Sequence, residues 1–179
     1  MSKRQQSLSE IESSYGNPDP WGYFSNPHDQ LRRDFLKSVL SKHSPSRALD
    51  IGCGNGFITK TIPASEVVGV DISKAAIDEA KLRSSDGNID YQCRSLFELK
   101  ERNLGTFDCI LITGVLYGQY IGRSMPLIYR IVDHLLRNDG ILISVHIDEW
   151  YFAKFPYAHI EKHRYKYRSY THLLEVYRK

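Results

Sequence analysis

The residues most suited to binding a ligand lie between Ala48 and Gly56, where an apolar segment ends in Asp50 and runs directly into a glycine-rich turn. Glycines at Gly52, Gly54 and Gly56 allow the backbone to turn sharply and to approach a ligand with no side chain in the way. We therefore expect a strand and a turn that bind a nucleotide-type ligand, followed by a helix that starts within residues 57–62.

A second apolar segment, Val67 to Val70, ends in Asp71 about twenty residues after the first glycine, the spacing at which an acid reaches ribose hydroxyls. The glycine order also separates two classes of cofactor. A dinucleotide fingerprint carries its third glycine where Phe57 stands here, so NAD is disfavoured. The alternative interpretation is a tight turn between a core strand and a helix, with no ligand.

Side chains that can accept or orient a proton follow two later apolar segments. Tyr117 comes after the fourth expected strand, and His146, Asp148 and Glu149 lie at the end of the fifth. Ligands of open α/β sheets bind beyond the carboxyl ends of the strands, so both groups are candidates for general acid–base work or for orienting a reacting group. The alternatives are a hydrogen-bonded strand residue for His146 and a packing role for Tyr117.

The order D-x-G-x-G-x-G, followed by an acid after the next strand, resembles motif I and its successor in the class I S-adenosylmethionine-dependent methyltransferases. The resemblance implies that Asp50 and the glycine loop hold the methionine part of S-adenosylmethionine, that Asp71 holds the ribose and that Ile72 packs on adenine. The loop residues are Gly52, Cys53, Gly54, Asn55 and Gly56. The match covers residues 48–179.

One position departs from this family pattern. An acid that follows the third strand often binds the adenine amino group, whereas this chain has Arg94 and Ser95 there. Either Ser95 or a backbone carbonyl would then accept that hydrogen bond. Thr113 ends the fourth strand and is expected to border the transferred methyl group.

A narrower resemblance rests on two short motifs, Asp19-Pro20-Trp21-Gly22-Tyr23 and Val115-Leu116-Tyr117. They are similar to the nodulation protein S-like N-methyltransferases, which methylate the free amine of a chitooligosaccharide. This resemblance implies that Trp21 and Tyr23 belong to a lid beside the cofactor and stack on a sugar or on the bound cofactor. The residues alone leave a second role open, in which the aromatic loop anchors the N-terminal part to the domain.

The hydrophobic pattern predicts the elements that position these residues. We expect helices over residues 27–41, 73–83 and 124–137, and strands over 48–51, 67–71, 89–93, 107–113, 141–147, 163–168 and 171–178. With the family resemblance, this predicts an α/β fold: a Rossmann-like, doubly wound, mostly parallel seven-stranded sheet with an antiparallel C-terminal hairpin. Residues 1–13 are expected to be a flexible tail, and residues 14–179 a single methyltransferase domain in which 14–40 form the candidate lid.

Composition excludes several other classes of protein. The chain has 179 residues, 41% of them hydrophobic, and a formal net charge of +3, and it contains no apolar run of membrane-spanning length and no secretory segment. We expect a cytoplasmic protein with reduced cysteines. No metal site is proposed, because His159 and His163 lack a third ligand. In residues 163–168 we expect the tyrosines to face the core and the basic side chains to face water, in preference to a nucleic-acid surface.

The predicted function is methyl transfer from S-adenosyl-L-methionine to a nitrogen or oxygen of a small-molecule or glycan acceptor. The rival functions are methylation of RNA or protein, and non-catalytic binding of the cofactor by an interaction protein. We expect no nucleic-acid partner and no membrane association, and the sequence leaves the oligomeric state open.

Overall fold

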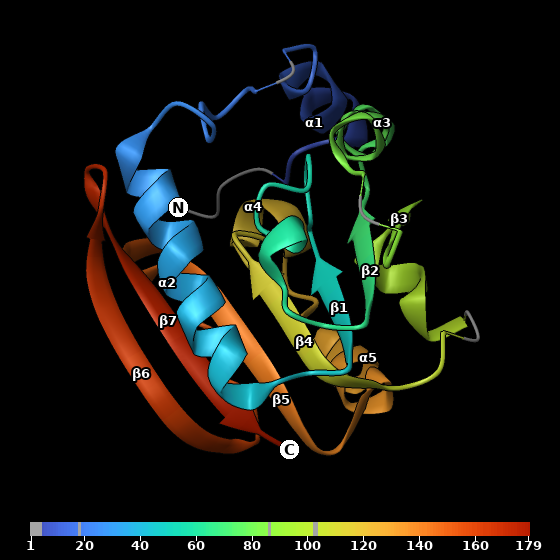
Figure 1. Ribbon diagram of the computed structural model, residues 1–179, viewed down its shortest axis with the longest axis vertical. Helices are drawn as coiled ribbons and strands as arrows, with labels where there is room; N and C mark the ends of the chain where they lie inside the picture. The colour runs from blue at the N-terminus through green and yellow to red at the C-terminus, as the bar shows by residue number, and fades with distance from the viewer. Residues whose placement is uncertain (1–4, 18, 86, 102–103) are drawn as a thin grey trace.

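One seven-stranded sheet organises the computed structural model, which describes residues 5–17, 19–85, 87–101 and 104–179. The strand order is β3-β2-β1-β4-β5-β7-β6. Strands β1 to β5 pair with one another in parallel, and β7 is antiparallel to both β5 and β6 (Figure 1). The predicted fold class is confirmed. The strands are Arg47–Ile51 (β1), Glu66–Asp71 (β2), Ile89–Cys93 (β3), Phe107–Thr113 (β4), Leu136–Ile147 (β5), Ala158–Tyr167 (β6) and Tyr170–Arg178 (β7).

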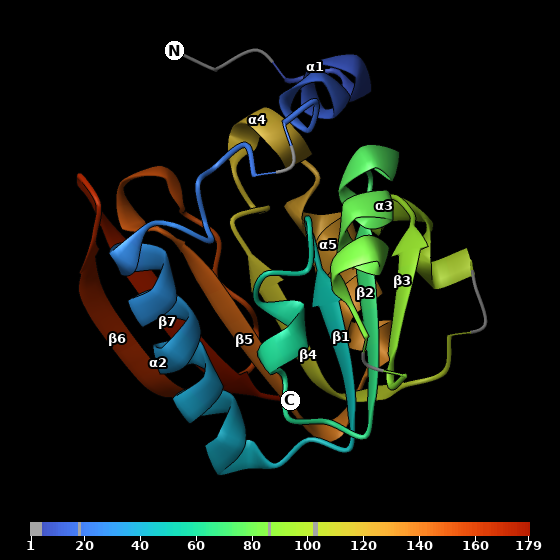
Figure 2. The ribbon, with the colours of Figure 1, turned by 45° about the horizontal axis from the view of Figure 1, so that its top comes forward.

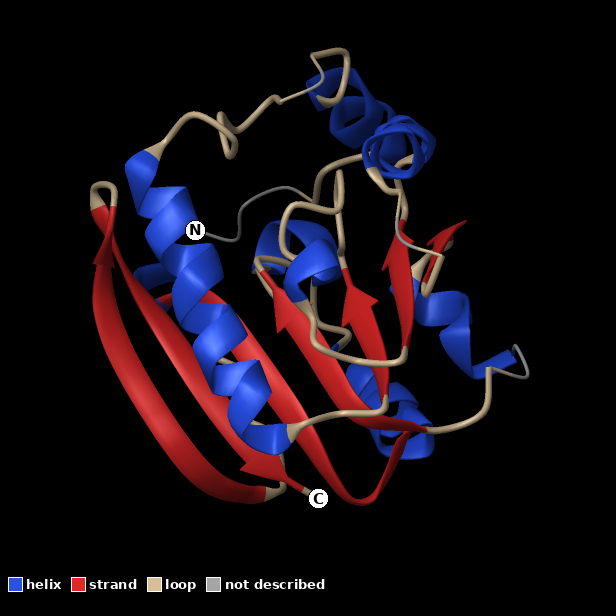
Figure 3. Cartoon of the chain, in the orientation of Figure 1, coloured by secondary structure: helices blue, strands red, loops and turns tan. Residues whose placement is uncertain are grey.

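Helices lie on both sides of this sheet (Figure 3). At two of the predicted helix starts, capping side chains are in place: Asn26 accepts from the His28 N–H, and Ser73 accepts from the Ala76 N–H. The α-helices are Leu8–Ser14 (α1), Pro27–His43 (α2), Lys74–Arg83 (α3), Gly118–Ile121 (α4) and Met125–Leu135 (α5), and the 3-10 helices are Thr59–Thr61 (η1), Leu96–Glu101 (η2) and Asp148–Trp150 (η3).

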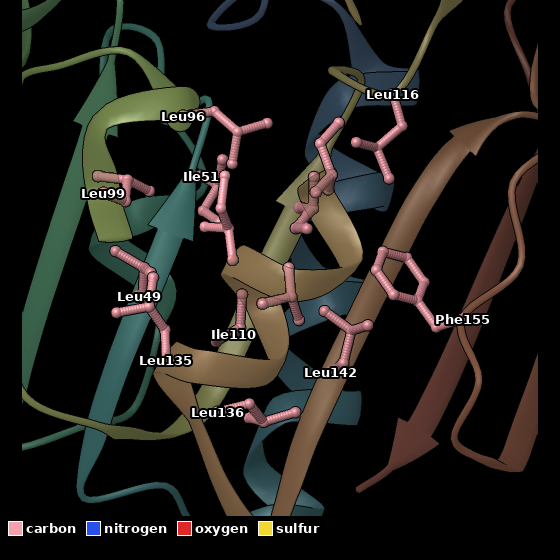
Figure 4. Packing of buried hydrophobic residues seen from close by; sticks show 14 of the residues in the cluster. Leu49, Ile51, Leu96, Leu99, Ile110, Leu116, Leu135, Leu136, Leu142 and Phe155 are labelled. Atoms are coloured by element: carbon pink, nitrogen blue, oxygen red, sulfur yellow. The ribbon is translucent and has the colours of Figure 1, made fainter. Parts of the chain in front are cut away.

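Alternate residues of the central strands build two separate cores. Leu49 and Ile110 belong to the cluster that includes α5 and η2 on one face (Figure 4). Ala48 and Leu111 point to the other face, where the buried stripe of α2 covers the sheet. A parallel strand that is covered on both faces reads as a continuous apolar run, which is why β4 was predictable from residues 107–113.

The described part of the expected flexible tail contains a helix, because residues 8–14 form α1; residues 1–4 of that tail lie outside the described residues. Ser7 and Glu10 make a capping box: the Ser7 hydroxyl accepts from the Glu10 N–H, and the Glu10 carboxylate accepts from the Ser7 N–H. The S-x-x-E signature that carries this cap is present in the sequence. Helix α1 lies next to α3 and α4 above the carboxyl ends of the strands (Figure 2).

The helix expected to start within residues 57–62 is reduced to the single 3-10 turn η1. Pro63 explains the early stop, because the residue before a proline is pushed out of the helical region. Ile62 accordingly adopts an extended conformation, with φ −72° and ψ 116°. At the other end of the chain, α5 ends at Leu135, two residues before the predicted end, and β5 begins at the next residue.

Candidate active site

A pocket of about 420 Å³ opens beyond the carboxyl ends of β1, β2, β4 and β5, where the strand order reverses between β1 and β4. It brings together most of the residues that the sequence nominated. The nominated residues that line it are Trp21, Tyr23, Asp50, Gly52, Cys53, Gly54, Asn55, Asp71, Ile72, Ser95, Thr113 and Tyr117.

Asp50 is a buried carboxylate in which one oxygen accepts a hydrogen bond and the other is available to a ligand. Its Oδ2 accepts a hydrogen bond from the Thr59 hydroxyl at 2.7 Å, whereas Oδ1 is buried and has no partner among the described residues. Burial raises the pKa of Asp50 to about 7, against a smaller lowering by the Thr59 hydrogen bond. A cationic group from a ligand would satisfy Oδ1 and the carboxylate charge together.

Asp71 ties the glycine loop to the start of α3. One carboxylate oxygen accepts from the Gly54 N–H and the other from the Ser73 N–H, each at 2.9 Å. Burial raises the pKa of Asp71, and these two N–H groups oppose that rise. A carboxylate has about four lone-pair positions, so both oxygens keep a site for a ligand hydroxyl.

The glycine loop is closed to side chains at two of its positions. Gly52 has φ +77°, and a Cβ atom there would lie 2.1 Å from a methyl carbon of Val115. At Gly56, with φ +78°, a Cβ atom would lie 2.5 Å from the Tyr91 hydroxyl. Gly56 does not line the pocket, so its requirement for glycine comes from packing against β3.

The predicted adenine side contains a half-exposed apolar residue and a serine that already has a partner. Ile72 is 39% exposed and lines the pocket. The Ser95 hydroxyl accepts from the Phe97 N–H at 3.2 Å, where η2 begins. The structure therefore gives Ser95 a local role, and a role toward adenine stays a prediction. Cys53, whose thiol pKa burial raises, completes this part of the lining.

The aromatic loop before α2 has one ring packed on the domain and another ring that faces the pocket. The Tyr23 ring stacks on Phe57 with 5.5 Å between ring centroids, and the Arg32 guanidinium lies 4.9 Å from the Tyr23 centroid. Trp21 is 42% exposed and lines the pocket. Tyr23 thus anchors the loop, whereas the Trp21 ring is accessible to a ligand.

Helix α1 and its flanking residues form the roof of the pocket, to which Ile11 and Tyr15 contribute. Glu12 fastens this roof to α3: its carboxylate accepts from the Lys74 N–H at 2.6 Å and from the Ser73 hydroxyl at 2.9 Å. Burial, which raises the pKa of Glu12, is outweighed by these bonds, so the pKa lies below its ordinary value. The carboxylate also complements the positive end of the α3 dipole.

We expect Glu12→Ala to weaken binding of S-adenosylhomocysteine between about twofold and thirtyfold, since a side-chain cap of a helix N-terminus contributes about 0.5–2 kcal/mol. The physical reason is that the roof helix loses its attachment to α3, so the covered form of the pocket is less populated. Isothermal titration calorimetry measures the change. Asp78→Ala, which removes an exposed carboxylate from α3 without touching α1, is the control, and equal affinities for the two variants would contradict the role of Glu12.

His146 does not line the pocket, which corrects its candidacy as a proton acceptor. The side chain is fully buried, Nε2 accepts from the Leu116 N–H at 3.1 Å, and Nδ1 lies 3.0 Å from the Ser144 hydroxyl. Burial lowers the pKa of His146 to about 3, so the ring is neutral. Its alternative interpretation, a hydrogen-bonded strand residue, fits this geometry, because the bond to Leu116 holds the loop after β4.

Asp148 and Glu149 are also turned away from the pocket lining. Asp148 accepts from Arg164 at 2.7 Å, and Glu149 accepts from the Thr171 N–H at 3.1 Å. Both bonds join η3 to the C-terminal hairpin.

Tyr117 does line the pocket, and its hydroxyl accepts from the Ile147 N–H at 2.7 Å. Burial raises the pKa of Tyr117 to about 12, so this hydroxyl stays protonated and can donate to a ligand.

The pocket residues that were not nominated from the sequence include Arg32, Arg168 and His172. Arg32 is 7% exposed and contacts the fully buried Asp29 at 3.3 Å, while its Nε has no partner among the described residues. Arg168 donates to Asp29 and, at 2.6 Å, to the carbonyl of Trp21. The expectation that this arginine faces water is therefore wrong, although Tyr165 and Tyr167 do face inward as predicted.

His172 reaches the pocket because β7 lies between β5 and β6. In the sheet it is paired with Ile147 on one side and with Tyr165 on the other. Its Nδ1 lies 3.2 Å from the Tyr165 hydroxyl, and its ring stacks on Tyr167 with 3.8 Å between centroids. Burial, with smaller effects from Arg32 and Arg168, lowers the pKa of His172 to about 3. No local motif marks this histidine, because its position depends on long-range strand pairing.

The part of the chain that the structure describes contains no group of three or more histidine, cysteine, aspartate or glutamate side chains arranged to hold a metal ion. Within the same residues, no helix combines the length and apolarity that crossing a bilayer requires.

Comparisons with known proteins agree with this fold. Residues 42–175 match the family model described as a methyltransferase domain. Among curated proteins, the chain is 35% identical over 98 residues to a ubiquinone biosynthesis O-methyltransferase of Nitrosococcus oceani, an alignment that covers 51% of this chain and 41% of that protein. The chain therefore spans less than half of the length of that relative.

Two solved structures share the fold over almost the whole chain. The N-methyltransferase NodS of Bradyrhizobium japonicum WM9, in complex with S-adenosyl-L-homocysteine, superposes with a TM-score of 0.80 at 22% identity, over 96% of this chain and 97% of that one. The magnesium protoporphyrin IX methyltransferase ChlM of Synechocystis PCC 6803 gives a TM-score of 0.75 at 16% identity, with complete coverage of both chains. The predicted resemblance is confirmed, and the chain belongs to the methyltransferase domain family, as a class I, S-adenosylmethionine-dependent member.

Proposed function

We propose that this protein transfers the methyl group of S-adenosyl-L-methionine to a nitrogen or an oxygen of a small-molecule or glycan acceptor. The observation that carries the proposal is the composition of the pocket. One side, at the ends of β1 and β2, contains Asp50, the glycine loop and Asp71. The other side, between the aromatic loop and β7, is lined by aromatic rings and contains none of these cofactor residues.

The residues on the first side fit the proposed cofactor. The available Oδ1 of Asp50 suits a cationic amino group. Arg32 acts electrostatically on both Asp50 and His172, and its unpartnered Nε suits a carboxylate, so the two ends of an amino acid have complementary partners. Asp71 offers carboxylate lone pairs to ribose hydroxyls, and Ile72 offers an apolar surface to adenine. Arg32 thereby joins the cofactor residues that the sequence predicted.

S-adenosylmethionine supplies a methyl group that is already activated by the positive sulfonium. The chain then has to align the acceptor, exclude water and manage one proton. Thr113 and Tyr117 border the region between the two sides, and the bond from the Ile147 N–H fixes the Tyr117 hydroxyl. Tyr117 is thus proposed to orient the acceptor, and residues 14–40 to cover it as a lid, with Trp21 against the ligand and Tyr23 as the anchor.

Affinity for S-adenosylhomocysteine should rise by about tenfold from pH 6 to pH 8, because the fraction of ionised Asp50 rises about tenfold across a pKa near 7. The sign follows from charge: protonated Asp50 is neutral and loses its attraction for a cationic amino group. Calorimetry at the two pH values measures this rise. Asp50→Asn keeps the other titrating groups and should show a flatter dependence, whereas identical pH profiles for the two proteins would contradict the assignment.

Transfer of a labelled methyl group tests the proposed function. The protein is incubated with methyl-labelled S-adenosylmethionine and, in separate reactions, pooled small amines and phenols, chitooligosaccharides, total RNA and total protein. We expect label in a small molecule or a glycan. Label confined to RNA or protein would replace the proposal with the macromolecular alternative. Cofactor binding without transfer to any of the four classes would instead favour a non-catalytic binding protein.

A further inference from the structure

On the side between the aromatic loop and β7, the pocket has apolar aromatic walls and a floor that carries a polar imidazole. Trp150 and Tyr170 meet with 4.8 Å between ring centroids, and Tyr117 packs against Trp150 at 5.7 Å. Together with Trp21, which also lines the pocket, these rings make apolar walls suited to a flat ring. The floor is formed by β7, where His172 contributes an imidazole that is 4% exposed and lines the pocket.

The surroundings of His172 leave one ring nitrogen for a ligand. Nδ1 is 3.2 Å from the Tyr165 hydroxyl, and Nε2 has no hydrogen-bond partner among the described residues. The neighbouring Tyr167 hydroxyl is not available to Nε2, because it donates to Asp29 at 2.6 Å. The stacked Tyr167 ring fixes the plane of the imidazole, so Nε2 keeps one direction.

Burial, and to a smaller degree the neighbouring positive charges, keep this histidine neutral by lowering its pKa. Arg32 and Arg168 both act on it, and the carboxylate beside them, Asp29, is bonded to both guanidinium groups. A proton on His172 would add a further positive charge to this cluster. The imidazole is therefore neutral at neutral pH, and in the tautomer whose Nδ1–H donates a hydrogen bond to the Tyr165 hydroxyl oxygen, Nε2 is a hydrogen-bond acceptor.

We infer that Nε2 of His172 accepts a hydrogen bond from the nucleophilic hydroxyl or N–H of the methyl acceptor, and that this acceptor is a small ring-bearing molecule. The inference rests on the proposed function and narrows its acceptor class. This hydrogen bond fixes the direction of the O–H or N–H of the nucleophile, and thereby directs the lone pair of the nucleophilic atom toward the methyl group. A carboxylate oxygen carries no hydrogen at neutral pH, so carboxylate acceptors are selected against.

Three probes that share one ring test the inference: catechol, its monomethyl ether guaiacol and its dimethyl ether veratrole, with benzoate as the carboxylate probe. Binding to the protein saturated with S-adenosylhomocysteine is measured by calorimetry. We expect catechol to bind at least about tenfold more tightly than veratrole or benzoate, the effect of leaving one buried acceptor without its donor. Equal affinities, or no binding of catechol at millimolar concentration, would overturn the inference.

Substitutions at His172 separate hydrogen bonding from packing. His172→Leu should abolish the preference for catechol over veratrole, whereas His172→Gln, whose amide oxygen can accept at a similar distance, should retain most of it. His159→Leu on the exposed side of β6 is the control. A His172→Leu protein that still prefers catechol would contradict the inference. Affinity for S-adenosylhomocysteine should stay within about twofold of the unmodified protein in every variant. If the unmodified protein does not bind S-adenosylhomocysteine, the result counts against the proposed function instead.

Discussion

Asp71→Ala is expected to weaken binding of S-adenosylhomocysteine by at least about a hundredfold. Each hydrogen bond from a hydroxyl to a carboxylate contributes about 1.5–3 kcal/mol, and the Asp71 carboxylate is proposed to accept two from the ribose. The same substitution frees the Gly54 N–H and the Ser73 N–H, so the glycine loop loses its link to α3. Calorimetry on the purified variant measures the loss.

The fold should survive this substitution. The Gly54 N–H belongs to the pocket lining, where water can replace the lost bond, whereas Ser73 is 0% exposed and its N–H loses its partner. We therefore expect the free energy of unfolding to fall by about 1–3 kcal/mol. Asp71→Asn keeps an acceptor oxygen without the charge and should fall between the two proteins in affinity. Unchanged affinity in Asp71→Ala, with a normal melting transition, would remove Asp71 from the cofactor site.

Asp29→Ala should lower the free energy of unfolding by about 3–5 kcal/mol, the typical cost of breaking a buried ion pair by removing one partner. Asp29 is 0% exposed and accepts from the Tyr167 hydroxyl at 2.6 Å, and Arg32 and Arg168 both pair with it. Its removal leaves two guanidinium groups close together without their carboxylate. Urea-induced unfolding, followed by circular dichroism, measures the change.

The matched control is Asp34→Ala on the same helix. Asp34 is exposed and pairs with its neighbour Arg33, so its removal should change the free energy of unfolding by less than about 1 kcal/mol. Similar losses for the two variants would contradict the role assigned to the buried cluster. The cluster joins α2, the aromatic loop and the β6–β7 turn, so Asp29→Ala should also weaken any binding that depends on Trp21.

Structural features could be predicted from the sequence wherever a short segment determines its own structure. The glycine loop and Asp71 could be predicted because their spacing reflects one strand, one turn and the next strand. Glu10, three residues after Ser7, marked the start of α1 in the same local way, although the polar composition of residues 1–13 pointed to a tail. Pro63 likewise gave a readable reason for the short η1 turn.

The side of the pocket between the aromatic loop and β7, where we propose that the methyl acceptor binds, was harder to predict from the sequence. Its residues meet through strand order and long-range packing. His146 lies near the end of β5 and His172 near the start of β7, and only the pairing of β7 beside β5 places the second of them in the pocket. Arg168 looked like a solvated strand residue, yet the turn brings it to Asp29 on a helix that lies far away in sequence. Such pairings have no signal in composition or in periodicity.

Binding of S-adenosylhomocysteine tests the central claim most directly, with NAD as the comparison ligand in the same calorimeter. We predict saturable binding of S-adenosylhomocysteine at one site per chain and no binding of NAD, in line with the phenylalanine at the third-glycine position. Binding of NAD, or no binding of S-adenosylhomocysteine to protein whose cooperative melting shows it to be folded, would contradict the assignment of this pocket.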